Sequence, residues 1–289
     1  MATSDDELVA LPVDGTTCID YSDGGGQGEP ILLVHAGVFG AWFAPLAADS
    51  ALDGFRTIRM LRAGYASGPA PAGHVTVADH AAHCAALLDS LGIDRAHILA
   101  HSSGCVIALQ LALDRPDLVG SLILSEPPLI ACLAAPDDLE FLGTEVGPVI
   151  GGAVAAAARG DVAAAFEQFM TVICGPDYRN VLRAALGPNS LARAEQDSRF
   201  FFADEISAVQ EWGFDEEAAA AIRHPVLLVQ GGASPPPVHR LVAHLAAMMP
   251  DTEVATIDGD DHLLPLRSPA ALGRLVGEFC RRQRAAADA

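Results

Sequence analysis

Hydrophobic positions follow two different periods through the first half of the chain. Strand-like apolar runs occupy residues 31–34, 57–61, 97–100 and 121–124, and apolar residues recur at helical spacing over 77–91 and 106–113. Strands that alternate with helices predict crossover connections and a mostly parallel sheet covered on both faces. Two earlier runs, 7–13 and 16–21, predict an antiparallel hairpin at one sheet edge with its turn at Asp14-Gly15.

The pattern changes after residue 128. Residues 129–222 show helical periodicity alone, interrupted by Gly and Pro. The segments that follow are strand-like at 225–229 and 253–257 and helical at 270–282. We therefore predict an α/β fold class with a mostly parallel central sheet and helices on both faces. The core domain is expected to comprise residues 1–128 and 223–289, and a helical cap to comprise residues 129–222.

The chain is strongly acidic. It has 17 basic and 37 acidic residues, a formal net charge of −20, and every basic residue is Arg. The lack of Lys excludes a Schiff-base lysine, a Gly-Lys-Ser/Thr phosphate loop and a Ser-x-x-Lys catalytic pair. Because this charge repels nucleic-acid phosphates and anionic lipid surfaces, we expect neither nucleic acid nor a membrane as a partner.

Compartment signals favour the cytoplasm. Residues 1–7 are acidic and lack the positive start of a signal peptide, and the longest apolar stretch, 147–158, is shorter than the roughly 20 residues that span a bilayer. The six cysteines form no Cys-x-x-Cys pair, so we interpret them as reduced thiols. We predict a soluble, cytoplasmic protein.

A small-x-Ser-x-Gly turn is the clearest candidate for chemistry. Ala100-His101-Ser102-Ser103-Gly104 lies directly between a predicted strand and a predicted helix. Such a turn presents the central Ser at the top of the sheet, and small neighbours allow the close backbone approach. Only Ser102 has small residues at both offsets, so we predict it as a nucleophile. The alternative is an ordinary helix cap. The N–H of Ser103 and the helix dipole would stabilise an oxyanion.

With this turn, the chain resembles the α/β-hydrolase family from about Glu29 to Cys280. The family's usual elbow is Gly-x-Ser-x-Gly, and here Ala100 replaces the first Gly. The resemblance also implies that the loop after the first long strand, His35-Ala36-Gly37, supplies a second oxyanion donor at Gly37, paired with the N–H of Ser103. His35 itself is expected to be structural.

The base follows from the same resemblance, whereas the acid departs from the family's commoner pattern. Of the ten histidines, His262 follows the last predicted strand, where the family's catalytic His lies, although two adjacent Asp leave a surface-loop role open. Many members of the family carry an Asp shortly after the strand that corresponds to residues 225–229, but here no carboxylate occurs from 226 to 240. We therefore predict Glu126, at the end of strand 121–124, as the acid. The alternatives beside His262 are expected to be solvated: Asp258, Asp260 and Asp261.

This chain order, with a Ser, a Glu after the next strand and a distal His, resembles that of the fungal zearalenone lactonases. Their elbow also carries Ser-Ser-Gly, their acid ends a Glu-Pro-type strand, and the turn at 232–235 looks like theirs. The match is confined to these short motifs. It supports the triad more than it identifies a substrate.

Substrate contacts are expected beside the oxyanion loop and in the cap. We predict Val38, Phe39 and Trp212 as substrate-binding residues, and Trp42 as a packing residue. The sequence has no Cys/His cluster that suggests a zinc site, so no metal and no cofactor are implied.

The sequence predicts a cofactor-free serine hydrolase that cleaves a small-molecule carboxylic ester or lactone through an acyl-enzyme. A cyclase, lyase or C–C bond hydrolase that uses the same triad as a proton shuttle is the main alternative, and a non-catalytic ligand receptor is a third. Specificity depends on the cap, so the natural substrate is left open. The oligomeric state is also open, with a homodimer as one alternative.

Overall fold

The computed structural model describes residues 8–13, 15, 17–129, 132–133 and 135–287. The described strands form one eight-stranded sheet in the order β1-β2-β4-β3-β5-β6-β7-β8. Their bounds are Val9–Pro12 (β1), Cys18–Asp23 (β2), Pro30–Val34 (β3), Arg56–Leu61 (β4), Ala96–His101 (β5), Val119–Ser125 (β6), Val226–Gly231 (β7) and Thr252–Ile257 (β8). β1 and β2 pair antiparallel, β2 pairs antiparallel with β4, and the neighbours from β4 to β8 are parallel.

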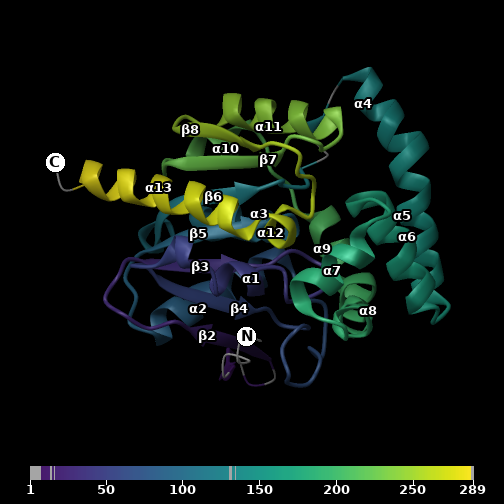
Figure 1. Cartoon of the computed structure of the whole chain (residues 1–289), viewed down its shortest axis with the longest axis horizontal. Coiled ribbons are helices and arrows are strands. Elements are labelled where there is room, and N and C mark those ends of the chain that lie inside the picture. The colour runs from purple at the N-terminus through teal and green to yellow at the C-terminus, as the bar shows by residue number, and fades with distance from the viewer. Residues whose placement is uncertain (1–7, 14, 16, 130–131, 134, 288–289) are drawn as a thin grey trace.

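Helices cover both faces of this sheet (Figure 1). One face packs against α2, α3 and α11, and the other against α1, α12 and α13. Their bounds are Ala44–Ala47 (α1), Val77–Ser90 (α2), Ser103–Asp114 (α3), Pro236–Met248 (α11), Leu264–Arg267 (α12) and Pro269–Ala287 (α13). On β3, Leu32 and Val34 pack toward the first group, whereas Ile31 and Leu33 pack toward the second. Successive side chains on a strand point to opposite faces, so this fully apolar run fits a strand buried on both faces.

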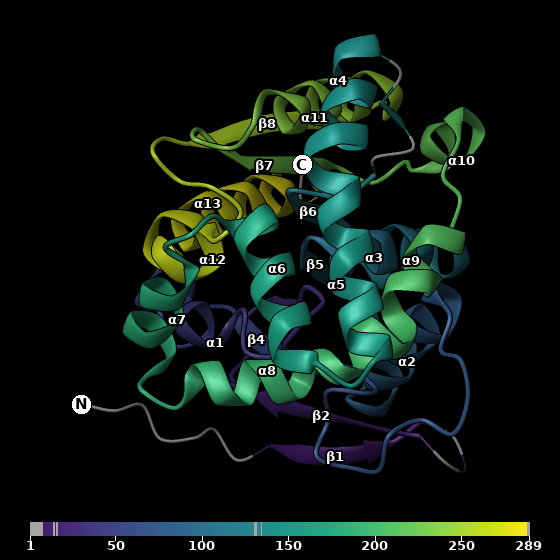
Figure 2. The same cartoon turned by 90° about the vertical axis from the view of Figure 1, so that its right-hand side faces the viewer.

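A helical segment separates β6 from β7. Its elements are α4 (Pro136–Phe141), a π-helical segment (Leu142–Val146), α5 (Gly147–Ala158), α6 (Val162–Cys174), α7 (Tyr178–Leu186), α8 (Ser190–Phe200), a second π-helical segment (Phe201–Glu205), α9 (Ile206–Glu211) and α10 (Glu216–Ala221). We call residues 136–221 the helical insertion. Figure 2 shows α5 and α6 side by side in front of the ends of the central strands, with α8 below α6. The described part of the insertion contains no strand, as the periodicity predicts.

Several expected elements differ in extent. The hairpin pairs Pro12 with Cys18, while Asp14 of its expected turn and Thr16 of its expected second strand lie outside the described residues. The last helix begins at Pro269 and reaches Ala287, although its buried apolar face ends at Cys280. The apolar stretch 147–158 is part of a continuous helical run, Pro136–Ala158, which is long and apolar enough to cross a membrane by length and composition. In the fold this run packs against α6.

Several buried histidines are kept neutral by the fold. His97 on β5 is 6% exposed, and its Nδ1 lies 2.8 Å from Ser121 Oγ on β6. Burial, with the nearby positive charge of Arg95, lowers the pKa of His97 to about 4. Burial likewise lowers the pKa of His35 and His80 well below the usual value. These histidines therefore bind protons in the unfolded chain at a pH at which they stay neutral in the folded chain.

We expect the free energy of unfolding to decrease on acidification from pH 7 to pH 5. A His in the unfolded chain titrates near pH 6.5, whereas His97 in the folded chain has a pKa of about 4. The contribution of His97 to the free energy of unfolding is therefore lost as the pH falls from about 6.5 toward 4. His97→Asn should reduce the decrease by on the order of 1–2 kcal/mol in urea titrations. The exposed His244 provides the matched control, His244→Asn. Equal pH dependence in wild type and His97→Asn would contradict this expectation.

Candidate active site

Ser102 lies at the sharp turn between β5 and α3. Its φ of 49° and ψ of −124° form a conformation that costs a non-Gly residue about 1–3 kcal/mol. Its N–H donates to the carbonyl of Ser125 on β6 at 2.9 Å. Gly104 is required two residues later, because a Cβ there would lie 2.3 Å from the carbonyl oxygen of Val34 and 2.7 Å from that of His35. The turn therefore holds the Ser102 side chain at the carboxyl end of the sheet.

Backbone strain concentrates around this turn. Among the described residues other than Gly, those with positive φ are Val38 at 74°, Ser102 at 49° and Glu126 at 47°. Val38 follows β3, Ser102 follows β5 and Glu126 follows β6, and all three line one cavity. Strained backbone persists only where the surrounding structure holds it, and it clusters at functional sites. The strain thus marks this cavity as the candidate active site.

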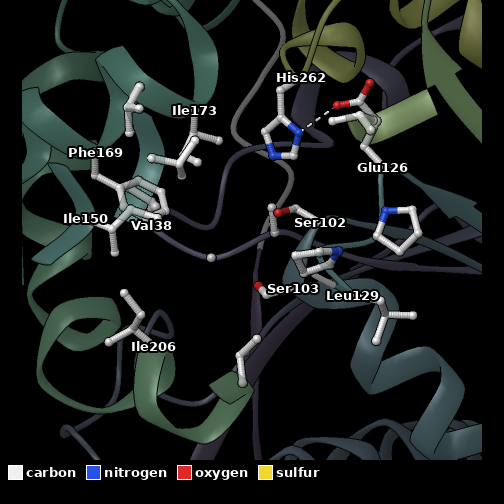
Figure 3. Close-up of a pocket in the computed structure, with 18 of the residues that line it drawn as sticks. Val38, Ser102, Ser103, Glu126, Leu129, Ile150, Phe169, Ile173, Ile206 and His262 are labelled. Atoms are coloured by element: carbon white, nitrogen blue, oxygen red, sulfur yellow. Dashed lines mark hydrogen bonds and ion pairs between the residues drawn. The ribbon is translucent and has the colours of Figure 1, made fainter. Parts of the chain in front are cut away.

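Glu126 and His262 form a buried hydrogen-bonded pair. His262 Nδ1 lies 2.8 Å from Glu126 Oε2 (Figure 3), and Glu126 is 3% exposed. The other carboxylate oxygen, Oε1, accepts the N–H of Gly231 at 2.9 Å and the hydroxyl of Ser234. Both donors belong to the end of β7 and its following turn, which has no carboxylate in this chain. Instead, that turn supplies donors that orient the carboxylate from β6.

The surroundings of Glu126 favour its ionised form. Burial alone would raise the pKa of Glu126. The hydrogen bond from His262, the positive charge of His262 and the donors from Ser234 and Gly231 outweigh burial and lower the pKa to about 2. An ionised Glu126 accepts from Nδ1 of His262 and leaves Nε2 of that ring free to act on a nearby hydroxyl.

Ser102 and His262 face the same cavity. Figure 3 shows the Ser102 hydroxyl and the His262 ring pointing into the space between the sheet and the insertion. The described hydrogen bonds include none between Ser102 Oγ and His262 Nε2. Hydrogen bonds of this kind are often long in free enzymes and tighten in the complex with substrate. The structure therefore brings together the Ser, His and Glu that the sequence analysis selected.

The two expected oxyanion donors flank the Ser102 turn. The N–H of Ser103 belongs to the first turn of α3, where helical N–H groups have no intrahelical acceptor. Within the described residues, neither this N–H nor that of Gly37 donates to a protein acceptor. The carbonyl of Gly37 accepts from the N–H of Phe39 at 3.0 Å and from Trp42 Nε1 at 2.9 Å, which fixes the loop. This arrangement suits an anion-binding pair of N–H groups.

The cavity has a volume of about 420 Å³ and lies between the helical insertion and the sheet with its covering helices, which we call the sheet domain. Volumes of this size suit a small molecule. The described lining contains no Arg and no Asp, and Glu126 is its one carboxylate. Aliphatic and aromatic side chains from the insertion form much of the wall, among them Leu142, Val146, Ile150, Phe169, Ile173 and Ile206. The site thus combines a few polar groups at one end with a large apolar space.

The structure corrects one expected substrate contact. Val38 and Trp212 line the cavity, whereas Phe39 does not. The positive φ of Val38 turns the chain so that Phe39 is 1% exposed and stacks on Trp42, with ring centroids 4.4 Å apart. Trp42, which was expected only to pack, lines the cavity as well. Trp212 is fixed by donation from its Nε1 to Gln110 Oε1 at 2.7 Å.

The carboxylates beside His262 behave differently from one another. Asp258 is exposed, as expected, but Asp260 is 2% exposed and not solvated. The backbone of Asp260 packs against the turn after β7, where its carbonyl accepts the N–H of Ala233 at 2.7 Å, and burial raises the pKa of its side chain. Asp261 accepts the N–H of Leu263 at 2.9 Å. Among the described hydrogen bonds, only Glu126 joins the His262 ring to a carboxylate.

Two residues that the sequence analysis did not select as functional support the pair. Ser234 donates to Glu126, and its sequence signal is its place in the turn that usually carries the acid. His101 packs its ring against His262, with centroids 4.7 Å apart, and Nδ1 lies 3.1 Å from the Ser125 carbonyl oxygen. Burial and the charge of His262 lower the pKa of His101 to about 3, so it stays neutral. Its position just before Ser102 offered no sign of this contact.

One feature of the described residues concerns metal binding. No group of three or more His, Cys, Asp or Glu side chains there is placed to hold a metal ion.

Residues 31–275 match the alpha/beta hydrolase family. Since this region covers more than half of the chain, and the sheet order and helical layers are those of its fold, the protein belongs to the alpha/beta hydrolase family. Its fold is the α/β-hydrolase fold, as the sequence resemblance implied.

Individual relatives are similar over parts of the chain. A segment of 118 residues is 35% identical to the dihydrolipoyllysine-residue acetyltransferase component of the acetoin cleaving system of Cupriavidus necator, covering 40% of this chain and 30% of that protein. A segment of 100 residues is 35% identical to the putative carbamate hydrolase RutD of Klebsiella pneumoniae, covering 34% of this chain and 37% of that protein. The chain thus spans about a third of the length of these curated relatives.

A solved structure shares the fold over nearly the full length. The enol-lactonase of Burkholderia xenovorans LB400 has a TM-score of 0.76 to this chain at 19% sequence identity, with 94% of this chain and 100% of that chain covered. This likeness shows the fold that the two proteins have in common.

Proposed function

We propose that this protein is a cofactor-free serine hydrolase that cleaves a neutral, apolar carboxylic ester or lactone. The observation that carries the proposal is the hydrogen-bonded His262–Glu126 pair beside Ser102, whose positive φ presents its hydroxyl to an apolar cavity. A Ser, a His and a carboxylate that holds the His form the arrangement that activates a serine nucleophile. The position of the acid after β6 is the feature that resembles the zearalenone lactonases.

In the proposed first half-reaction, Ser102 Oγ attacks the carbonyl carbon while His262 Nε2 takes the hydroxyl proton. The carbonyl oxygen becomes an oxyanion and accepts from the N–H groups of Gly37 and Ser103. The tetrahedral intermediate collapses, the bond to the leaving oxygen breaks, and His262 returns the proton to that oxygen. The products are an acyl-Ser102 and an alcohol.

In the second half-reaction, water attacks the acyl-Ser102. His262 removes a proton from the water, the oxyanion forms between the same two N–H groups, and the carboxylic acid leaves as His262 reprotonates Ser102. Glu126 remains ionised throughout. It holds His262 with Nε2 toward Ser102 and stabilises the positive ring that forms in each step. With a lactone, the leaving alcohol stays attached to the acyl group.

The lining of the cavity supports a neutral substrate. A carboxylate or phosphate placed among the wall residues of the insertion would lose its hydration, and the described lining offers it no Arg. The enol-lactonase and the carbamate hydrolase named above agree with hydrolysis at a carbonyl carbon. We further propose that the insertion acts as a cap whose apolar side chains select the acyl or lactone portion, and that the protein acts on small molecules in the cytoplasm.

The proposed nucleophile is tested by mass spectrometry after treatment with an alkyl fluorophosphonate. We expect the folded wild type to gain one adduct on Ser102, because His262 and Glu126 activate this hydroxyl. Ser102→Ala should gain none, and Ser103→Ala, which removes only the neighbouring hydroxyl, should still be labelled at Ser102. An unlabelled wild type, or an adduct that persists in Ser102→Ala, would contradict the proposal.

The proposed substrate class is tested with a matched pair of esters. We expect a kcat/KM for p-nitrophenyl hexanoate at least about 100-fold above that for the mono-p-nitrophenyl ester of adipic acid, because a terminal carboxylate is unpaired in this cavity. Steady-state kinetics at pH 7.5 compare the two. Equal kcat/KM values would show that the cavity accepts anionic acyl groups and would refute a neutral-substrate site.

A further inference from the structure

A buried carboxylate from the insertion lies directly above the oxyanion loop. Glu205, at the end of the π-helical segment Phe201–Glu205, is 1% exposed. A Cβ built on Gly37 would lie 3.1 Å from Glu205 Oε1. The side chain does not line the cavity, so it has no direct access to a substrate there. A buried carboxylate without such access calls for an explanation, because burial of a charge is costly unless the charge is paired and hydrogen bonded.

Every described hydrogen-bond partner of the Glu205 carboxylate belongs to the sheet domain. Oε1 accepts the hydroxyl of Ser103 at 2.6 Å and Arg62 Nη2 at 2.8 Å, and Oε2 accepts the hydroxyl of Tyr65. The Tyr65 oxygen in turn accepts the N–H of Val38 at 3.1 Å. One carboxylate from the insertion thus connects the residue after the nucleophile with the loop that follows β3.

These connections hold both sides of the expected oxyanion hole. Ser103 carries one of the two N–H donors, and Val38 directly follows Gly37, which carries the other. Val38 has a φ of 74°, which is costly for a β-branched residue and persists only where neighbouring groups hold it. The hydrogen bond from its N–H to Tyr65, and that of Tyr65 to Glu205, supply this restraint.

Arg62 compensates for the charge that this arrangement places near the site. A lone carboxylate above Gly37 would repel the oxyanion that forms beside it. Arg62 is completely buried and pairs with Glu205, and its own N–H donates to His35 Nε2 at 3.1 Å, at the start of the same loop. The ion pair keeps four hydrogen bonds in place with no net charge beside the oxyanion.

From this geometry we infer that Glu205 is a positioning residue that orients the oxyanion donors of Gly37 and Ser103 through Ser103, Tyr65 and Arg62. The inference rests on the proposed function. It also couples the insertion to catalysis, since the donors are fixed only while the segment that carries Glu205 is seated against the sheet domain. In this role Glu205 contributes to stabilising the transition state and not to binding the substrate.

The test is the steady-state kinetics of Glu205→Gln on p-nitrophenyl hexanoate. Removing one oxyanion donor outright costs about 10²–10³ in kcat. Loosening both donors should therefore lower kcat by about 10- to 100-fold, with KM within about threefold of wild type. A trifluoromethyl ketone, which adds to the serine to give a tetrahedral oxyanion, should be bound more weakly by the same factor as kcat/KM falls.

Asp204→Asn is the matched control. Asp204 is the neighbouring carboxylate and also connects the insertion to the sheet domain, through His74 Nδ1 at 2.6 Å and the N–H of Val75 at 2.9 Å, away from the oxyanion loop. The Asp204→Asn variant loses the same charge and an equivalent contact as Glu205→Gln, and its kcat should stay within about twofold of wild type. Equal kinetics of Glu205→Gln and Asp204→Asn, or an effect on KM alone, would overturn the inference.

Two further measurements keep the outcomes distinct. If Glu205→Gln is unfolded at the assay temperature, Tyr65→Phe replaces it. This change removes only the link from Glu205 to the Val38 N–H, so it should loosen the Gly37 donor alone and lower kcat by a smaller factor, about 10-fold, with KM unchanged. A wild type that hydrolyses no ester and gains no fluorophosphonate adduct refutes the proposed function itself. An active wild type with an unaffected kcat in Glu205→Gln and Tyr65→Phe refutes the positioning role alone.

Discussion

The hydrogen bond between His262 and Glu126 is the interaction on which the rest of the site depends. The carboxylate comes from the end of β6 and the imidazole from the loop after β8, while β7 lies between these strands and contributes Gly231 and Ser234 as donors. Burial of a carboxylate is unfavourable, and here three donors offset it so that the pKa falls to about 2. The neutral ring of His101 packs against the ring of His262. The pair is thereby held in one orientation before any substrate binds.

A second buried carboxylate serves the opposite side of Ser102. Glu205 belongs to the insertion, and its charge is balanced by Arg62, whereas Glu126 is paired with a histidine. The two carboxylates therefore have separate partners: Glu126 orients the proposed base, and Glu205 faces the oxyanion loop. The space between them is lined by aliphatic and aromatic side chains, where electrostatic interactions are stronger than in water. A site of this kind favours a neutral molecule that develops charge only during the reaction.

The sequence predicts those parts of the molecule that depend on local pattern. Ser102 could be selected because a strand, a tight turn and a helix are encoded within a few residues, and the parallel sheet places Glu126 and the loop before His262 at the same edge. Glu126 was reached by elimination, since the turn after β7 lacks a carboxylate; the donation from Ser234 that explains this exchange appears only in three dimensions.

Other features depend on contacts that no local pattern encodes. Phe39 was expected at the substrate because it follows the oxyanion loop, yet the positive φ of Val38 sends it into the core. Asp260 was expected to be solvated, but its loop folds back onto the turn after β7. Glu205 contacts Ser103 across 102 positions of the chain, and nothing in the insertion sequence marks this one acidic residue among its many. Long-range pairing decides each of these cases.

The most direct test of the account is the kcat/KM of Glu126→Gln on a neutral ester, measured beside Asp261→Asn. The amide keeps the size of the side chain but removes the charge that fixes the ring of His262 and stabilises its protonated form. We predict a fall of about 10⁴-fold in Glu126→Gln, as for the loss of a triad acid elsewhere, and less than about tenfold in Asp261→Asn. Turnover near that of wild type in a folded Glu126→Gln would contradict the account, and so would an equal loss in both variants.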